Sequence, residues 1–483
     1  MKTYILASIF TDKKNLEEFK NNGENQGVGW IAGVPGVKYW RKEKNQIIKR
    51  ISNAEDRWDN FPETIWNLLY TDEHRYYMEN LKSCLEAKEM NKVYKYPVTR
   101  IQVLLSEKNI CSSDEIPGLA VLEVEVPEEE TGKEFKIDVE KVYQYLAKNQ
   151  LIPGLKIDDE EAKRHSGKSE GYKLQKSMWK KNIKPFTFTM NIIDYFDSLD
   201  TPNNIMDDNL RKINFINKLH LHTDGKKASY EAQKKWDKES PRGLRILGSG
   251  DWCFYARSKG IIYYIPSQPK NVGGEVLPHF FRGYAESFHL DAIMLSILKN
   301  ILVNYYIGKI QNHIKMGDNM AFKKINDTIN KMFIMYDMGR TVPRGGQHNI
   351  AMEKVEDALH FQDNLNVLID STNRIEEANS VQRQENLAIS QEKLAKSQEE
   401  LAKYALLVAI VMIIPGFVSL ISDGISTLSN HPWICIIYVI IAGIVIVKIN
   451  IYKKRNPNGY KNVKTMISNI IDFDKLDESN SSR

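Results

Sequence analysis

The sequence predicts an α+β cytosolic domain, followed by a long helical stalk and a C-terminal two-helix transmembrane hairpin. Three observations favour this fold class. Short β-rich runs are spread over residues 1–282. Apolar residues recur at three- and four-residue steps from residue 283 onward, which is the helical period. Two uncharged stretches lie near the end of the chain, and the first has about the length that a bilayer core requires.

Composition limits the functions open to the chain. Its 483 residues carry 67 basic and 62 acidic side chains, a net charge of +5, so no direct contact with nucleic acid is expected. The four cysteines are scattered at Cys84, Cys111, Cys253 and Cys435, which indicates neither a disulfide framework nor a zinc site. This pattern fits a reduced, cytosolic compartment for the larger part of the chain.

Within the cytosolic domain, residues 3–10, 99–106 and 118–126 are predicted to be strands. The first of these runs is short and soon followed by charges, so it is expected to be a strand and not a signal peptide. Apolar and aromatic residues at helical spacing predict one or two helices over residues 54–87.

The second half of this domain contains a charged stretch and further strands. Residues 156–184 are expected to form a solvated insertion or linker, although their basic side chains leave anion binding open as the alternative. Strands are expected near residues 185–190, 245–256 and 260–265, and the Gly-Ser-Gly in the second predicts a bulge or tight corner.

His220 and His222 alternate as they would on a strand, with Asp224 close behind. This is the one cluster that resembles metal-ligand spacing. No third ligand is evident, so ordinary surface histidines before a turn are the preferred interpretation, and no metal site is assigned.

Helices are predicted almost to the end of the chain from residue 283. Residues 283–350 are expected to form a helical packing region, with a long amphipathic helix over 283–315 and a second helix near 319–336. Because neither proline nor glycine occurs between Gly346 and Pro415, residues 353–422 are expected to form one continuous helix of about 100 Å. The cytosolic stalk is expected to cover residues 351–403.

One thin apolar seam runs along the lower stalk, where Leu387, Leu394, Leu401 and Val408 recur every seven residues. Polar side chains dominate the rest of residues 370–403. A single seam cannot bury a lone helix, so other subunits are expected to supply its neighbours in a symmetric bundle. The alternative is an isolated, partly frayed linker helix.

The hairpin consists of a first span at residues 404–422, an external loop at 423–432, a second span at 433–451 and a basic tail at 452–483. Lysines before the first span and a Lys-Lys-Arg cluster after the second place both ends in the cytoplasm. Pro415 and Gly416 lie inside the first span and predict a helix bend, although membrane helices also tolerate both residues.

This organisation resembles the CorA-type magnesium transport family. In that family a proline in the first span is followed nine residues later by an external Gly-Met-Asn signature, whereas here Pro415 is followed by Gly424, Ile425 and Ser426. Only the glycine is kept. The resemblance implies a CorA-like pentameric funnel, a homopentamer whose first spans surround one axial pore.

The resemblance also assigns positions in that pore. The pore-facing positions would be Lys403, Leu406, Ile410, Ile414, Phe417 and Ile421, which helical spacing also places on one face. Apolar rings that close the pore by dewetting would be formed by Leu406, Ile410, Ile414 and Phe417. Asp423, Gly424, Ile425 and Ser426 would form the external mouth, and Lys453, Lys454 and Arg455 a cytoplasmic basic collar.

The missing signature changes the expected mechanism. The family's asparagine ring holds hydrated Mg²⁺ through its water shell, and Ser426 offers only a hydroxyl there, with Asp423 as a replacement carboxylate. A pore without its usual filter and with an enlarged cytosolic domain is similar to the membrane effectors of type III CRISPR systems. These respond to a nucleotide second messenger such as SAM-AMP or a cyclic oligoadenylate.

The sequence therefore predicts a ligand-gated ion channel in the bacterial inner membrane that disrupts ion balance during antiviral defence. The nucleotide would be its ligand, and its pocket cannot be placed from the sequence. A divergent Mg²⁺ or Co²⁺ transporter, with the divalent cation as permeant ion, is the first alternative. A non-conducting membrane-anchored scaffold is the second. No catalytic residue is assigned, since no nucleophile elbow, HExxH, P-loop or paired Cys-x-x-Cys motif occurs.

Overall fold

The computed structural model describes most of the chain as far as residue 424. The described ranges are 1–12, 29–43, 46–89, 92–107, 115–127, 139–148, 185–195, 208–223, 247–249, 252–257, 259–266, 270–272, 275–277, 280–316, 319–336 and 346–424, with isolated positions elsewhere. The predicted charged insertion at 156–184 lies outside them. The chain divides into two compact units, Met1–Glu377 and Ala378–Arg483.

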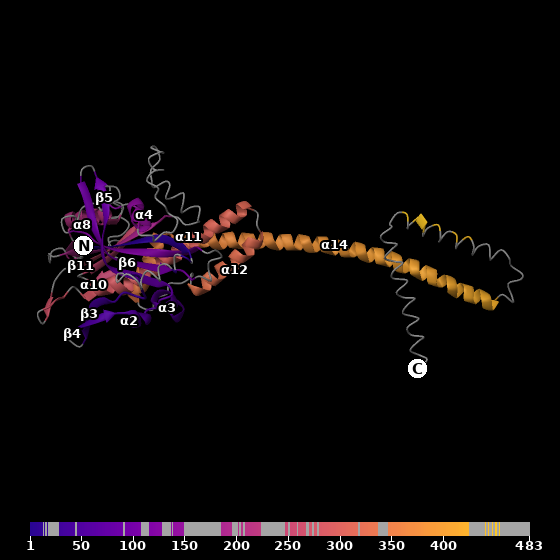
Figure 1. Cartoon of the computed structure of the whole chain (residues 1–483), viewed down its shortest axis with the longest axis horizontal. Helices are drawn as coiled ribbons and strands as arrows, with labels where there is room; N and C mark the ends of the chain where they lie inside the picture. The colour runs from indigo at the N-terminus through magenta and orange to yellow at the C-terminus, as the bar shows by residue number, and fades with distance from the viewer. Residues whose placement is uncertain are drawn as a thin grey trace. The chain divides into compact units, whose positions relative to one another are not determined.

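The first unit is mixed α/β, and a nine-stranded sheet forms its centre (Figure 1). All neighbouring strands are antiparallel except β8 and β11, which are parallel. In spatial order the strands are β2 (Ile31–Ala32), β5 (Arg75–Glu89), β6 (Lys92–Leu105), β7 (Glu115–Glu125), β1 (Lys2–Asp12), β8 (Thr187–Tyr195), β11 (Gly260–Pro266), β10 (Trp252–Arg257) and β9 (Leu247–Ser249). Two short hairpins, β3–β4 (Val37–Glu43 and Gln46–Ser52) and β12–β13 (Lys270–Val272 and Glu275–Leu277), form separate sheets.

Several predicted strands are confirmed. The runs at residues 3–10, 99–106 and 118–126 correspond to β1, β6 and β7, and the runs at 185–190 and 260–265 correspond to β8 and β11. The segment at 245–256 forms two strands, β9 and β10, which pair with each other around the Gly-Ser-Gly as expected for a corner.

The predicted helices over residues 54–87 are only partly correct. Residues 54–58 and 63–70 form α2 (Ala54–Trp58) and α3 (Glu63–Tyr70), but residues 75–89 form strand β5. Buried Leu85 and Ala87 alternate with exposed Glu86, the period of a strand. Backbone pairing with β6 along nearly the whole length of β5 outweighs the local helical spacing.

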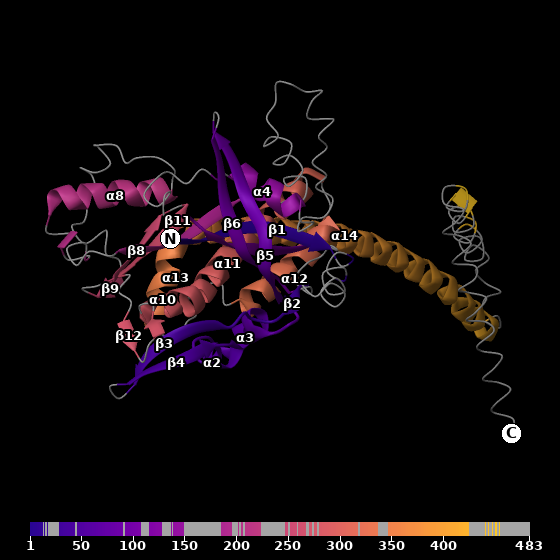
Figure 2. The same ribbon diagram turned by 60° about the vertical axis from the view of Figure 1, so that its left-hand side comes forward.

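Both faces of the sheet are buried around β10 and β11. Phe254 and Tyr263 join the main core, whereas Tyr255 and Tyr264 join a second cluster that includes residues of helix α8 (Asn209–Thr223). In Figure 2, α8 lies on one side of β8 and β11, and α10, α11 and α13 lie on the other. Strands buried on both faces carry long apolar runs, as Gly260–Pro266 does.

A buried helical rod packs on the main-core face. It consists of α10 (Phe280–Tyr284), the π-helical turn η4 (Ala285–His289) and α11 (Leu290–Met316). The prediction of a helix here is confirmed. The prediction that this helix is amphipathic is wrong, because every residue from 287 to 303 is buried. The β3–β4 hairpin, α2 and α3 form a further layer on the opposite side of this rod (Figure 2). The layer approaches closely, since a Cβ on Gly283 would lie 2.1 Å from that of Tyr39.

The same rod accounts for the one membrane-span candidate among the described residues. Phe281–Asn312 is long and apolar enough to cross a bilayer, but 89% of its most apolar window is buried inside the fold. A core helix enclosed by two layers has this composition, so the candidate is weak evidence for a span.

The remaining helices connect the rod to the stalk. α4 (Val139–Lys148) packs on β5, while α12 (Asn319–Met335) and α13 (Gly346–Ala358) pack on α11. α14 (Phe361–Gly424) follows. The prediction of one continuous helix from residue 353 is wrong, because His360 adopts a positive φ of 52° and separates α13 from α14. Side chains at Phe361, Leu365 and Leu368 are nevertheless buried in the core, which anchors the start of α14.

Candidate functional site

The predicted pore stripe lies on α14, which is helical without interruption through Pro415 and Gly416 to Gly424. Lys403 and Leu406 are exposed, and Leu406 retains 65% of its accessible surface. The Lys403 ammonium donates to Glu399 Oε1 at 2.6 Å within the same helix. For Ile410, Ile414, Phe417, Ile421, Asp423 and Gly424 the structure describes the helical backbone only.

The other predicted membrane residues are described less fully. Ile425 and Ser426 of the external mouth lie outside the described residues, as do Lys453 and Arg455 of the basic collar and most of the second span. Lys454 is exposed. The two-span hairpin, the pore and the collar therefore stay predictions.

The histidine pair at His220 and His222 is not on a strand. Both residues lie on helix α8, where two residues of separation place side chains on different faces. The His222 side chain is buried, with 2% exposure, and neither of its ring nitrogens has a hydrogen-bond partner. Among the described residues no group of three metal-ligating side chains occurs.

Asp291, at the start of α11, is a buried polar centre. Its carboxylate accepts from Arg57 Nη1 at 3.1 Å and from Arg75 Nη2 at 2.8 Å. Arg57 comes from α2 in the outer layer and Arg75 from β5 in the sheet, so Asp291 links three layers. Burial lowers the pKa of the Arg57 guanidinium, and the Asp291 carboxylate opposes this effect. All three side chains are at most 1% exposed, so this is a structural charge cluster without access for a substrate.

A pair of histidines lies beside this centre. The His289 ring, on the π-helical turn, is hydrogen-bonded through Nδ1 to the hydroxyl of Tyr263 at 2.7 Å, and its centroid is 4.9 Å from that of His348. Burial lowers the pKa of His348 to about 4 and that of His289 well below its ordinary value. Both imidazoles are therefore neutral at physiological pH.

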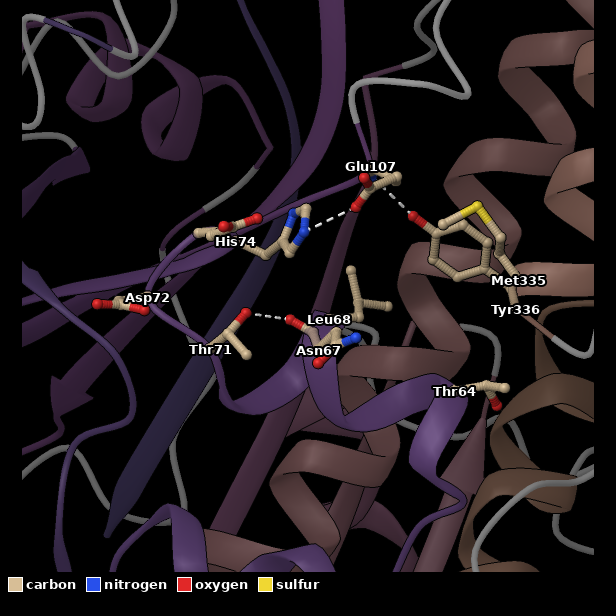
Figure 3. A pocket seen from close by; sticks show the side chains of 10 residues that line it. Thr64, Asn67, Leu68, Thr71, Asp72, His74, Glu107, Met335 and Tyr336 are labelled. Carbon is tan, nitrogen blue, oxygen red and sulfur yellow. Dashed lines mark hydrogen bonds and ion pairs between the residues drawn. The ribbon is translucent and has the colours of Figure 1, made fainter.

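A polar pocket opens near the end of α12 (Figure 3). Its volume is about 360 Å³. One wall is a single face of α3, formed by Thr64, Asn67 and Leu68 and continued by Thr71 beyond the helix. Three other segments complete the lining. Asp72, Glu73 and His74 come from the turn into β5, Glu107 follows β6, and Met335 and Tyr336 come from the end of α12.

The back of the pocket is held by a hydrogen-bonded triplet. His74 Nε2 lies 2.7 Å from Glu107 Oε2, and the Glu107 backbone N–H donates to the Tyr336 hydroxyl at 2.9 Å. The His74 side chain is only 8% exposed, whereas Glu107 keeps 24% and so reaches the cavity. These bonds join the turn before β5, the end of β6 and the end of α12 around one opening.

The charge around the pocket is negative. Asp72, Glu73 and Glu107 contribute carboxylates, and the lining residues that the structure describes include no lysine or arginine. Burial, followed by the negative charges of Asp72 and Glu73, raises the pKa of neighbouring Tyr76 to about 12.

No protein-family model, curated protein or solved structure matches this chain. The resemblance to CorA-type transporters therefore stays a prediction.

The pocket was not predicted from the sequence. His74 falls in a stretch for which a helix is expected, and Glu107 follows a strand without any motif around it. The one available signal is that Asp72, Glu73 and His74 form a short titratable run between apolar segments. Such runs usually indicate an ordinary turn, so only the tertiary structure brings them to Glu107 and Tyr336.

Proposed function

We propose that the chain is a CorA-like oligomeric ion channel of the bacterial inner membrane, opened by a ligand that binds its mixed α/β unit. The observation that carries this proposal is helix α14. It begins inside the folded core at Phe361 and continues to Gly424, through the uncharged stretch from residue 404. A helix that is anchored at one end and apolar at the other suits a link between a cytosolic domain and a bilayer.

The middle of α14 supports self-association. Leu387, Leu394 and Leu401 recur every seven residues and keep 61%, 60% and 52% exposure in the single chain. A glutamine precedes each leucine by three residues, at 384, 391 and 398. In a parallel bundle these positions would alternate apolar and polar layers, which fits a stalk with a hydrated interior.

Two lysines on this segment form ion pairs within their own helix. Lys396 pairs with Glu392 and Lys403 with Glu399 along the same helix, each at 2.6 Å. The leucines of the seam are apolar side chains that are exposed in the part of the single chain that the structure describes. Identical copies carry the same seam in the same register, so further copies of the chain are the partner that fits it best.

A nucleotide second messenger of the SAM-AMP or cyclic oligoadenylate type is what the resemblance to type III CRISPR effectors implies. A ligand of this kind would open the pore by binding the open state more tightly than the closed state, and the ratio of the two affinities would limit the response.

The first experiment measures the assembly. We expect the purified full-length chain in detergent to have the mass of an oligomer, and Leu394→Asn combined with Leu401→Asn to dissociate it because the seam loses its apolar layers. Ile389→Asn is the matched control, since Ile389 is also 50% exposed but lies off the seam. A single-subunit mass for the unmodified chain would contradict the proposal.

The second experiment measures transport after reconstitution into liposomes. Ion flux that appears only with a nucleotide ligand supports the channel. Constitutive Mg²⁺ or Co²⁺ flux supports the divalent-metal transporter instead. Absence of flux under both conditions leaves the membrane-anchored scaffold.

A further inference from the structure

The buried charges around Asp291 do not cancel. Arg57 and Arg75 each carry a positive charge, and the one carboxylate that they share supplies a single negative charge. All three side chains are at most 1% exposed. A buried charge without a counter-charge is strongly destabilising, so an excess of this kind indicates that a further negative group belongs to the cluster.

The titratable groups beside the cluster do not supply that negative charge. The strongest charges acting on Arg57 are those of Asp291 and Arg75. Burial, followed by the charge of Asp291, raises the pKa of Tyr70 well above its ordinary value, so this hydroxyl stays protonated. His348 is neutral, because burial lowers its pKa to about 4. The described groups therefore leave the cluster positive at physiological pH.

Arg75 also has a donor without an acceptor. Its Nη1 donates to the Leu69 carbonyl oxygen at 3.2 Å, and its Nη2 lies 2.8 Å from Asp291 Oδ1 and 2.9 Å from the Gln102 amide oxygen. In the part of the chain that the structure describes, its Nε has no hydrogen-bond partner, although the side chain is completely buried. An orphaned guanidinium N–H at such a depth indicates a water molecule or an ion beside it.

Two other arginines show that this combination is particular to Arg75. In Arg57 each of the three guanidinium nitrogens donates to an acceptor. Arg100 also has an Nε without a partner among the described residues, but Glu79 at 2.6 Å and Glu123 at 3.2 Å balance its charge. Excess positive charge and an orphaned donor thus occur together at Arg75.

We propose that this cluster binds one small monovalent inorganic anion, chloride or an ion of similar size, with the Nε–H of Arg75 as its donor. The ion supplies the negative charge that the cluster lacks and so stabilises the attachment of the outer layer to the rod and the sheet. A water molecule would accept the same hydrogen bond but would leave the charge unbalanced. This binding does not depend on the proposed channel function.

The test compares chloride with gluconate, a larger organic anion, at constant ionic strength. The purified full-length protein in detergent is unfolded with urea in mixtures of the two sodium salts, and tryptophan fluorescence gives the ratio of folded to unfolded protein. Above the dissociation constant, tenfold more chloride should raise this ratio about tenfold, because one ion binds the folded state. Bromide should replace chloride.

Gln102→Glu is the informative variant, since Gln102 is 2% exposed and accepts from Arg75 at 2.9 Å. A glutamate has nearly the same shape and supplies the missing charge, so chloride should change the ratio less than about twofold. Gln362→Glu is the matched control on the exposed surface of α14 and should keep the full chloride dependence. Equal chloride dependence in Gln102→Glu and the unmodified chain would overturn the proposal.

A second measurement detects the ion without unfolding the protein. The unmodified chain should broaden the chloride NMR signal more than Gln102→Glu does. Equal broadening by both would place chloride elsewhere and overturn the proposal. The unmodified chain alone also decides, because no broadening together with equal stability in chloride and gluconate would leave only water at Arg75.

Discussion

At the residue scale, Asp291 determines how the outer layer is attached to the rod and the sheet. Its carboxylate is the shared partner of Arg57 and Arg75, and the guanidiniums also bond Ser52, Pro35, Leu69 and Gln102. Buried charges are tolerated only when they are paired in this way. Two cations that share one carboxylate leave a net positive charge in the core, so the carboxylate is the member whose loss costs most.

Asp291→Asn should therefore destabilise the fold by about 3–5 kcal/mol, because two buried guanidiniums are left facing each other without a carboxylate. The measurement is a denaturant midpoint followed by tryptophan fluorescence on the full-length chain in detergent. Asp363→Asn is the control, since its side chain is 80% exposed and the change should stay within about 0.5 kcal/mol. An equal midpoint shift in both variants would contradict this role of Asp291.

His222 shows a different residue-scale effect. Burial, with a smaller contribution from Lys218, lowers its pKa to about 4. An unfolded histidine takes up a proton near pH 6.5, so below that pH the unfolded state binds protons that the folded state does not. Stability is thus fully present above pH 6.5 and is lost as the pH falls toward 4.

We expect His222→Leu to reduce this loss, because the buried group that resists protonation is gone. The slope of unfolding free energy against pH between 6.5 and 4 should decrease by about 1.4 kcal/mol per pH unit. At pH 8 the variant should be as stable as the unmodified chain or more stable, since leucine also removes an unpaired buried ring. An unchanged slope in denaturation at several pH values would show that His222 is not the titrating group.

At the element scale, α11 fastens the junction between α13 and α14. Lys299, fully buried, pairs with Glu356 of α13 at 3.2 Å, and its ammonium lies 5.4 Å from the ring centre of Phe361 at the start of α14. The next residue, Asn300, accepts from the Asn364 amide of α14 at 3.4 Å. The positive φ of His360 lies between these contacts, so α11 holds a bend that local sequence does not favour.

The two partners of this pair should respond unequally to substitution. Glu356→Leu leaves a fully buried ammonium and is expected to cost about 3–5 kcal/mol. Lys299→Met should cost less, because burial raises the pKa of Glu356 and lets it accept a proton. The double variant should be more stable than Glu356→Leu alone, and denaturation of all four proteins gives the coupling energy. Additive losses would exclude a direct interaction.

At the scale of the whole molecule, the two units divide the expected tasks. Met1–Glu377 contains the sheet, the buried rod and the polar pocket, whereas Ala378–Arg483 contains the leucine seam and both predicted spans. In the proposed channel the second unit conducts and the first controls it. The predicted gate is the apolar part of the pore stripe, which excludes water when its side chains are large.

Ile414→Ala or Phe417→Ala should therefore raise the basal leakage of reconstituted liposomes, because a wider ring wets more easily. Met412→Ala is the control, since position 412 is two residues from both 410 and 414 and so lies on the opposite helix face. Dye or ion release without ligand is the measurement. Equal leakage in all three variants and the unmodified chain would mean that these side chains do not form the constriction.

Local sequence patterns were enough to predict the helices and strands whose apolar residues recur with a clear period. The strands at β1, β7 and β11, helix α12 and the helical rod were all predicted, because alternation and helical spacing are written into a few neighbouring residues. The spans and the pore stripe come from composition and resemblance in the same way, and they stay predictions.

Tertiary structure decided what depends on contacts between distant residues. Segment 75–89 became a strand because β6 pairs with it, the rod lost its expected polar face because a second layer covers it, and His222 turned into the core on a helix. The pocket exists only because His74, Glu107 and Tyr336 meet across more than 200 residues of chain. A local sequence pattern determines whether a segment favours the helical or the strand period. Which side chains are buried, which strands pair and which distant residues come into contact depend on the surfaces that the folded chain brings together.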